Sequence, residues 1–388
     1  MPPPPIYLDA NSTVPVRPEA WEAMRPVMLE TYGNPASAHA HGRRARRCLD
    51  DARELVASIL GARPEEVVFT GGATEANNLA VFGLAGTWGG SAHVVASRLE
   101  HPCVVEPVRQ LAARGHAVTW LPATPAGHID PAVLLAAVTP GTKLVTLMLV
   151  NGETGCVQPV AEVARGLPAG VVLHCDAAQA VGKIAVDFRA LGVTTLSVSG
   201  HKFGAPKGVG LLLVRHGTAL TPQVFGGHQQ RGQRPGTEPV ALAVGLAAAL
   251  DAAVRNLAAD QAHRGELKHR FLERLRAGAG PVVVNGDGLP TTLNAAFPGC
   301  RSDLLLVSLD LAGVACSAGS ACSSGSLLPS PVLQTMGVPD AVLRSALRFS
   351  FSATLTLAEI DDAAARVVTA VRAVRTASGS PGPPAAGP

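Results

Sequence analysis

The feature that most restricts the fold of this chain is the alternation of short apolar runs with Ala-rich stretches over its first two-thirds. Short runs of aliphatic and β-branched residues bounded by loops are typical of parallel strands buried on both faces of a sheet. Strands that alternate with helices imply right-handed crossovers, so helices should cover both faces. We therefore expect an α/β sheet whose strands are residues 67–69, 93–96, 118–121, 144–149, 171–174, 195–198 and 210–214.

A second, smaller domain is expected after this pattern ends. Residues 239 to about 278 predict a long helical region, Ala-rich at first and then charged, which leads to apolar runs at 282–284, 292–296 and 304–309. A final helix is expected from about 357 to 375. We predict a large domain over 16–255, a small α+β domain formed by 1–15 and 256–376, and a disordered Gly/Pro/Ala-rich tail over 377–388.

Charge and hydropathy restrict the class of protein. The formal net charge is +3 and no long basic run is present, which argues against a nucleic-acid partner; the cluster of arginines at 43–47 is typical of a solvated helix face. The longest apolar stretch, residues 240–250, is too short to span a bilayer, so no membrane partner is expected. The Pro-rich N-terminus lacks the features of a signal peptide, and we expect a cytoplasmic protein.

The cysteines do not form a recognisable structural site. There are seven, an odd number, and none belongs to a CxxC pair. This pattern argues against a disulfide framework and against a tetrathiolate zinc site, so no metal is expected. Most of the seven should be buried small hydrophobic residues.

Polar residues follow several of the expected strands, where ligands bind in open α/β sheets. Gly71-Gly72-Ala73-Thr74 follows the first strand and opens an Ala-rich helix. Backbone N–H groups at such a helix start can hold a phosphate, although the same sequence also suits a simple turn. No Lys follows the glycines, so this is not a Walker loop.

Two ionisable residues follow later strands. Asp176 is costly at a buried strand end unless it pairs with a cation such as a protonated ring nitrogen; the alternative is a helix N-cap. Lys202 ends the segment Ser199-Gly-His-Lys202 in a chain with only five lysines and 27 arginines. An amine can form a Schiff base, which a guanidinium cannot, although a single lysine is usually a surface residue. Together, a phosphate cup, an acid for a ring nitrogen and an amine for an aldehyde predict pyridoxal phosphate.

From about Tyr7 to Thr356 the chain resembles the NifS/IscS-type cysteine desulfurases of the class V aminotransferase group. The resemblance implies a type I pyridoxal-phosphate transferase fold, with a mostly parallel seven-stranded sheet and a smaller C-terminal α+β domain. The stretches that carry it are Tyr7-Leu-Asp9, residues 32–39, Gly72-Ala-Thr-Glu-Ala-Asn-Asn-Leu79, Glu100-His-Pro102, Asn151-Gly-Glu-Thr-Gly155, residues 176–183, Ser199-Gly-His-Lys202, residues 231–237 and Ser317-Ala-Gly-Ser-Ala-Cys-Ser323.

The resemblance implies a role for each matching residue around the cofactor. Lys202 would hold its aldehyde, Asp176 would pair with its ring nitrogen, and Gln179 and Asn151 would contact its ring-oxygen side. The phosphate would be held by Ala73, Thr74, Ser199 and His201. Thr237 would reach the phosphate of the partner subunit, so a homodimer with shared sites is implied.

The resemblance also implies how the substrate, L-cysteine, is used. His101 would stack on the cofactor ring and move protons, and Arg344 would bind the substrate carboxylate through a planar bidentate contact. Cys322, in a Gly/Ser-rich segment typical of the long-loop desulfurases, would accept the sulfur as a persulfide and pass it to an acceptor protein. The acceptor could serve iron–sulfur cluster, thio-cofactor or tRNA biosynthesis. His101 or another base would ionise the thiol, whose unperturbed pKa is about 8.5.

Several positions depart from the family pattern. His228 replaces a usual glycine, Gln230 a usual glutamate, and Pro331 a histidine or tyrosine. Residues 351–353, Phe-Ser-Ala, replace a common Leu-Gly-Arg stretch, a change that bears on the substrate entrance.

Other functions are compatible with parts of the same pattern. A selenocysteine lyase or another class V aminotransferase would use the same scaffold, but an aminotransferase does not need Cys322. A catalytically silent scaffold for iron–sulfur assembly would not need Lys202, Asp176 and Cys322 together. A nucleotide-binding protein is disfavoured because no GxGxxG or Walker loop follows a strand.

Overall fold

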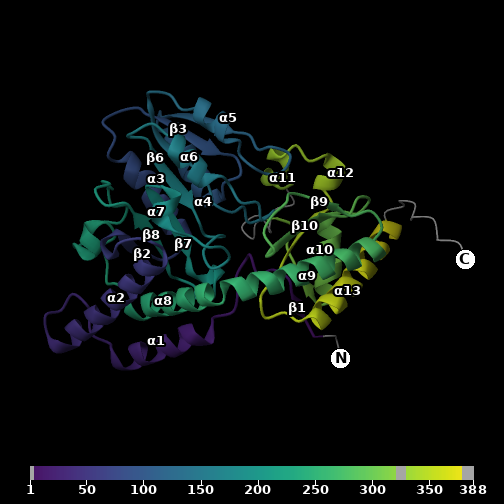
Figure 1. The fold of residues 1–388 in the computed structure, drawn as a ribbon, viewed down its shortest axis with the longest axis horizontal. Coiled ribbons are helices and arrows are strands. Elements are labelled where there is room, and N and C mark those ends of the chain that lie inside the picture. Colours follow the sequence, from purple (N-terminus) through teal and green to yellow (C-terminus); the bar gives the residue numbers. More distant parts are fainter. Residues whose placement is uncertain (1–3, 320–328, 378–388) are drawn as a thin grey trace, which may run out of the picture.

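A seven-stranded sheet occupies the centre of the larger lobe in the computed structural model, which describes residues 4–319 and 329–377 (Figure 1). Strand β8 pairs antiparallel with β2 and β7, and the remaining neighbours are parallel, which confirms the mostly parallel sheet. The strand order is β2 (Val67–Thr70), β8 (Gly210–Val214), β7 (Thr195–Ser199), β6 (Val172–Asp176), β5 (Thr142–Thr146), β3 (His93–Ser97) and β4 (Ala117–Leu121).

The strand expected at 144–149 ends earlier than the apolar run does. β5 ends at Thr146, which lies opposite Ala96 and is the last residue of β5 that pairs with β3. The N–H groups of Leu147 and Leu149 still donate to carbonyls of β6, so the run stays buried beyond the strand. Apolar character alone reports burial and does not mark where a strand ends.

Helices cover both faces of the sheet because side chains alternate along each strand. On β2, Phe69 packs into one core and Val68 into the opposite one; on β8, Leu211 and Leu212 divide in the same way. One face is covered by α3 (Ala73–Ala85) and α4 (Pro102–Ala113). The other packs against α1 (Pro18–Glu30), α2 (Ala40–Ile59), α5 (Pro131–Ala136), α6 (Val160–Gly166), α7 (Phe188–Leu191) and α8 (Val240–Arg255).

The smaller lobe has its own hydrophobic core (Figure 1). Its antiparallel sheet has the order β12 (Ala346–Ser350), β10 (Thr292–Ala296) and β9 (Val283–Val284), and a parallel pair joins β1 (Ile6–Tyr7) to β11 (Val314–Ala315). Its helices are α9 (Leu257–Gly278), α10 (Ser302–Leu311) and α13 (Leu357–Ala377), while the short α11 (Pro331–Thr335) and α12 (Asp340–Leu343) pack against the larger core. The predicted domain boundaries stay predictions, and most of the predicted tail lies outside the described residues.

The apolar run at 304–309 forms part of helix α10. Leu305 and Leu309, four residues apart, are buried in the small-lobe core, whereas Leu304 and Val307 are exposed. This spacing is that of a helix with one buried face. Without that spacing, a short apolar run does not distinguish a buried strand from a helix.

The helical region expected from 239 to 278 is two helices, α8 and α9, which meet at a bend of 68°. Within the described chain, no single helix has both the length and the apolar character that a membrane crossing requires, and α8 and α9 meet those criteria only as a bent pair.

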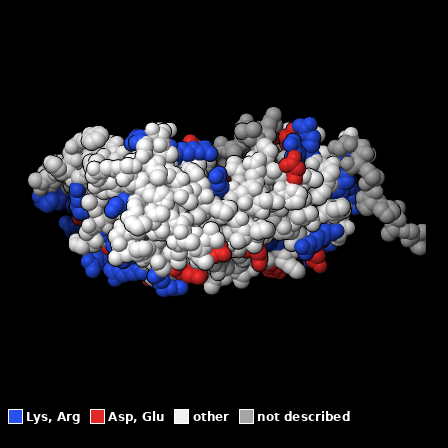
Figure 2. Space-filling model, turned by 90° about the horizontal axis from the view of Figure 1, so that it is seen from above, with Lys and Arg blue, Asp and Glu red and all other residues white. Residues whose placement is uncertain are grey.

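The arginines at 43–47 form the solvated helix face that the sequence predicts. They are exposed on α2, where Arg44 lies 3.7 Å from Glu30 and Arg46 lies 2.9 Å from Asp50. Figure 2 shows a face of the molecule whose middle is largely uncharged, with Lys and Arg gathered in separate groups towards its edges.

Candidate active site

A pocket of about 1460 Å³ lies beyond the carboxyl ends of the parallel strands, between the two lobes. Residues that follow β2, β3, β5, β6 and β7 all contribute to its walls, as expected where parallel strands end at one edge of a sheet. The sequence-predicted residues that line it are Ala73, Thr74, His101, Asn151, Asp176, Gln179, Ser199, His201 and Lys202.

One end of the pocket suits an anion. Helix α3 begins there after Gly72, whose φ of 152° favours glycine. Among the described residues, no side chain caps its first N–H groups, which belong to Ala73 and the residues after it. Such N–H groups and the helix dipole attract negative charge. Ser199 and His201 face the same pocket from the end of β7. Burial first, and then nearby Lys202, lowers the pKa of His201 to about 4.

Lys202 and Asp176 line the same pocket, Lys202 from the 3-10 turn that follows β7 and Asp176 from the end of β6. The Lys202 amine donates to the carbonyl oxygens of Asn11 and Ser12, at 2.7 and 2.8 Å. The buried Asp176 carboxylate accepts the Ala178 N–H at Oδ1, a cap-like contact, and the Asn77 Nδ2 amide at 2.8 Å on Oδ2. The residues after Asp176 form a turn and not a helix, so Asp176 is not a helix N-cap; its two oxygens have one local and one long-range partner.

The three remaining predicted pocket residues are held by hydrogen bonds, which are local for His101 and Asn151 and long-range for Gln179. His101 caps α4 by accepting the Cys103 N–H at Nδ1. The Asn151 side chain stabilises the turn that follows it, because its Oδ1 accepts from the N–H groups of Glu153 and Thr154. Gln179 donates from Nε2 to the Asn11 carbonyl, which also accepts from Lys202.

Arg344 does not lie where the sequence comparison placed it. Its side chain is 67% exposed at the end of α12, where it contacts Asp340, and it is not among the residues that line the pocket. Arg348, four residues later on β12, lines the pocket with a side chain only 2% exposed. Arg344 ends the surface helix α12, whereas Arg348 lies on the buried strand β12, and of these two arginines only Arg348 lines the pocket.

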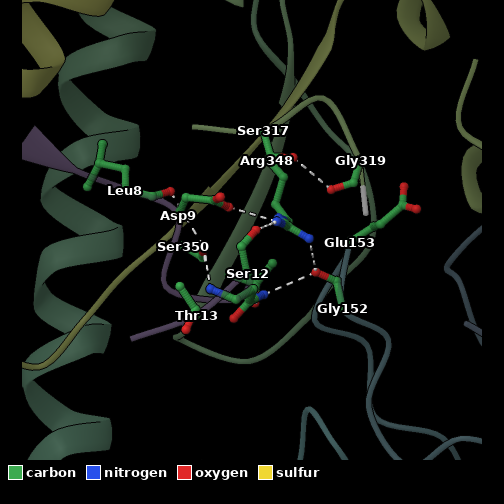
Figure 3. Close-up of polar contacts among 12 residues, drawn as sticks. Leu8, Asp9, Ser12, Thr13, Gly152, Glu153, Ser317, Gly319, Arg348 and Ser350 are labelled. Carbon is green, nitrogen blue, oxygen red and sulfur yellow. Dashed lines mark hydrogen bonds and ion pairs between the residues drawn. The ribbon is translucent and has the colours of Figure 1, made fainter. Parts of the chain in front are cut away.

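Arg348 is held firmly by neighbours from both lobes (Figure 3). Its Nη2 lies 2.7 Å from the Asp9 carboxylate and 2.8 Å from the Ser12 hydroxyl, and its Nη1 donates to the Gly152 carbonyl at 3.2 Å. Its buried Nε has no hydrogen-bond partner among the described residues. A buried arginine at a pocket wall is suited to a carboxylate ligand.

Sequence reasoning missed this arginine although a signal for it was present. Arg348 interrupts the apolar strand between Leu347 and Phe349, and a charge inside such a strand requires a buried partner. Lys183 was also missed. Its buried amine donates to Asn11 Oδ1 at 2.7 Å and to Gln179, and burial together with Lys202 lowers its pKa.

Glu100, in the Glu-His-Pro stretch, is a further buried residue of the pocket wall. Its carboxyl oxygens meet no hydrogen-bond partner among the described residues. Burial, and then the charge of Asp176, raises its pKa well above the ordinary value, although the Met148 N–H acts in the opposite direction. Burial of this carboxyl at the pocket wall therefore disfavours its charged form.

The remaining two predicted residues are Cys322 and Thr237. Cys322 lies outside the described residues, but the chain on both sides of its segment lies at the site, since Ser317 pairs with Arg348 and Pro331 lines the pocket. Thr237 is exposed and does not line the pocket of its own chain.

Of the residues that depart from the family pattern, only some lie at the pocket. Pro331 lines the pocket, and Gln230 is buried against β2, with its amide bonded to the N–H and carbonyl of Phe69. His228 is exposed. Phe351 is buried in the small-lobe core and is not part of the pocket wall, so this change concerns packing.

The donor set fits a ligand with a phosphate, an aldehyde and a basic ring nitrogen. An uncapped helix start, an amine and a carboxylate lie in one pocket, and each suits a different one of those groups. The charge of Glu75 near the helix start is balanced by Arg234, at 2.7 Å.

Comparison with known proteins gives the same family from sequence and from structure. The model of the family described as aminotransferase class-V matches residues 6–362. The "Cysteine desulfurase, mitochondrial" of Drosophila melanogaster is 41% identical over 96% of this chain and 82% of its own length. A solved structure described as a NifS-like protein has a TM-score of 0.89 at 32% identity, covering 94% of this chain and 98% of its own.

A second solved structure, "SspA in complex with cysteine", has a TM-score of 0.79 at 33% identity and covers 89% of this chain and 98% of its own. Both the family match and the relatives extend over both lobes, and they confirm the resemblance and the fold class that the sequence predicted. The chain belongs to the aminotransferase class-V family.

Proposed function

We propose that this protein is a pyridoxal-phosphate-dependent cysteine desulfurase that converts L-cysteine to L-alanine. The observation that carries the proposal is that Lys202, Asp176 and Arg348 line one pocket. Each of the three suits a different part of the cofactor or the substrate. Relatives named as cysteine desulfurases and the cysteine complex of a similar structure support the choice of substrate.

The cofactor would lie with its phosphate at the start of α3, held by Ala73, Thr74, Ser199 and His201. Its ring nitrogen would face Asp176, its aldehyde Lys202, and its ring-oxygen side Gln179 and Asn151. When bound, it supplies a sink for the electrons released at the substrate Cα. The Lys202 amine, once free, is the group that accepts the Cα proton.

Substrate binding and sulfur transfer would use two other residues. Arg348 binds the carboxylate of L-cysteine through its guanidinium. The Cys322 thiolate attacks the substrate sulfur, so an S–S bond forms as the Cβ–S bond breaks. The products are L-alanine and a persulfide on Cys322, which accounts for all the atoms of the free thiol and the substrate.

The partners form a further part of the proposal. Thr237, exposed on its own chain, would contact the phosphate in the partner subunit of a homodimer. The persulfide would pass to a sulfur-acceptor protein in the cytoplasm. No nucleic acid or membrane would take part directly.

The central experiment incubates the purified protein with L-cysteine and measures alanine and sulfide. Wild type should be yellow and should release both products in the presence of a thiol reductant. Lys202→Ala should lose the visible absorbance, and Cys322→Ser should keep the absorbance but release no sulfide. Cys48→Ser, on α2 away from the pocket, is the matched control and should behave as wild type. Formation of a keto acid without alanine would instead identify an aminotransferase.

The carboxylate contact is tested by a pair of arginine variants. Arg348→Lys keeps the charge but removes the planar donor pair, and we expect kcat/KM for L-cysteine to fall about 100-fold. Arg344→Lys should leave kcat/KM close to wild type, because this side chain is exposed to solvent. Equal effects from the two variants, or a larger effect at Arg344, would contradict the assignment.

A further inference from the structure

A buried chain of hydrogen bonds connects the sheet to His101. It starts at Thr195 on β7 and passes through His174 on β6, since Thr195 Oγ1 lies 2.9 Å from His174 Nδ1 and His174 Nε2 lies 2.9 Å from Asn77 Oδ1. Asn77 then donates from Nδ2 to Asp176 Oδ2 at 2.8 Å and to the Cys103 sulfur at 3.0 Å. The Cys103 sulfur in turn lies 2.9 Å from His101 Nδ1.

The direction of each bond in this chain follows from its fixed members. The Asp176 carboxylate accepts only, so the Asn77 nitrogen faces it and the Asn77 oxygen faces His174. His174 therefore donates from Nε2 and accepts at Nδ1 from the Thr195 hydroxyl. Burial lowers the pKa of His174 to about 4, which keeps this ring neutral.

The same reasoning locates the proton of His101. The Cys103 backbone N–H can only donate, and its acceptor is His101 Nδ1 at 3.2 Å. The Cys103 sulfur accepts from Asn77, so its own hydrogen can point to Nδ1, which is closer than its other acceptor, Asp176 Oδ2, at 3.8 Å. Burial lowers the pKa of His101; the charge of Asp176 acts against this effect, and that of Lys202 adds to it.

We propose that Cys103 and Asn77 are positioning residues that hold His101 as the Nε2–H tautomer. In this state Nδ1 is occupied by two donors, and Nε2 carries the only proton of the ring. His101 then enters the reaction as a hydrogen-bond and proton donor, and it does not act as the base that ionises Cys322. This assignment rests on the proposed desulfurase function, and it gives a role to a second thiol at the active site.

The tautomer is measured directly in the purified protein without substrate. In long-range proton–nitrogen NMR spectra of ¹⁵N-histidine-labelled protein, the His101 signals are assigned by their loss in His101→Gln. We expect wild type to show a protonated Nε2 and an unprotonated Nδ1. Cys103→Ser, which retains a donor, should keep this pattern, and Cys103→Ala should show a mixture of tautomers. Cys48→Ala serves as the cysteine control and should not change the spectrum.

Kinetics provide the second measurement. Cys103→Ala should lower kcat for alanine formation about tenfold, the effect expected for one lost hydrogen bond, with KM for L-cysteine nearly unchanged. Cys103→Ser should restore most of kcat. A proton on Nδ1 in wild type overturns the proposal, and so does a Cys103→Ala protein whose tautomer and kcat are both unchanged. A wild type that makes no alanine but shows the Nε2–H form would refute the desulfurase function and leave the positioning of His101 intact.

Discussion

At the level of single residues, Asp176 and Glu100 are both buried in the pocket wall but differ in their hydrogen bonds. The Asp176 carboxylate accepts one hydrogen bond on each oxygen, from Asn77 Nδ2 and from the Ala178 N–H. Glu100 is buried nearby without comparable donors, so ionisation of both acids would place two negative charges in one apolar region. Burial and the nearby charge of Asp176 therefore raise the pKa of Glu100.

Glu100→Gln should therefore change how stability depends on pH. The folded-state pKa of Glu100 is raised above its unfolded value, so wild-type stability is complete below about pH 4 and is lost as pH rises towards the folded pKa. Between the unfolded-state and folded-state pKa values of Glu100, the free energy of unfolding of the wild type should fall by up to about 1.4 kcal/mol per pH unit relative to the variant. The variant has no titrating group at this position. Thermal unfolding of the two proteins between pH 5 and pH 8 measures the difference. If the stabilities of the two proteins changed with pH in the same way across this range, Glu100 would be ionised in the folded protein.

At the scale of elements, the turn from β2 into α3 depends on the close approach of two backbones. A Cβ on Gly210 at the start of β8 would lie 2.5 Å from the Val198 carbonyl oxygen and 2.7 Å from the Gly72 Cα. Glycine at this position lets Gly72 reach the conformation that starts α3 at the pocket. The anion-binding end thus depends on a strand that contributes no side chain to it.

Gly210→Ala should displace this turn. We expect a loss of stability of about 1–3 kcal/mol from overpacking, together with weaker binding of pyridoxal phosphate. Gly265→Ala is the matched control, because Gly265 lies inside helix α9 and a Cβ there meets open space. That control should be neutral or more stable by about 0.5–1 kcal/mol. Chemical unfolding and cofactor titration measure both effects, and a Gly210→Ala protein with normal cofactor affinity would contradict this account.

At the scale of the whole molecule, strand β12 connects the small-lobe core to the pocket. Leu347 and Phe349 pack into that core, whereas Arg348, between them, points to the pocket and bonds to Gly152 of the large lobe (Figure 3). The alternation of a strand thus places the arginine at the boundary between the lobes. Packing of the small lobe and position of the arginine are coupled through one strand.

Phe351 contributes to this packing through its contact with Phe271, whose ring centre lies 5.7 Å away. Phe351→Ala should cost about 3–5 kcal/mol of stability because it leaves a cavity in the small-lobe core. Phe351→Leu, which restores a residue common in the family, should cost less than about 1.5 kcal/mol and leave KM for L-cysteine unchanged. Urea unfolding and steady-state kinetics test both. A large change in KM for Phe351→Leu without a change in stability would place this residue at the substrate entrance after all.

The sequence by itself determined the type of sheet and the chemistry at its edge. Strand and helix periodicity act over a few residues, so the β-branched runs predicted all seven strands of the large sheet. The carboxyl ends of parallel strands share one edge, which is why Asp176 and Lys202 could be expected to lie in one pocket. Both inferences depend on local periodicity and on a general rule of sheet geometry.

Only the tertiary structure decided which arginine faces the pocket and which groups hold His101. Arg344 and Arg348 lie four residues apart, and their exposure differs because one ends a surface helix and the other lies on a buried strand. The contact of Asn77 with His174 and Asp176 joins residues about a hundred positions apart in the chain. Such contacts depend on how elements pack, and local sequence does not encode the distance between two side chains on different elements.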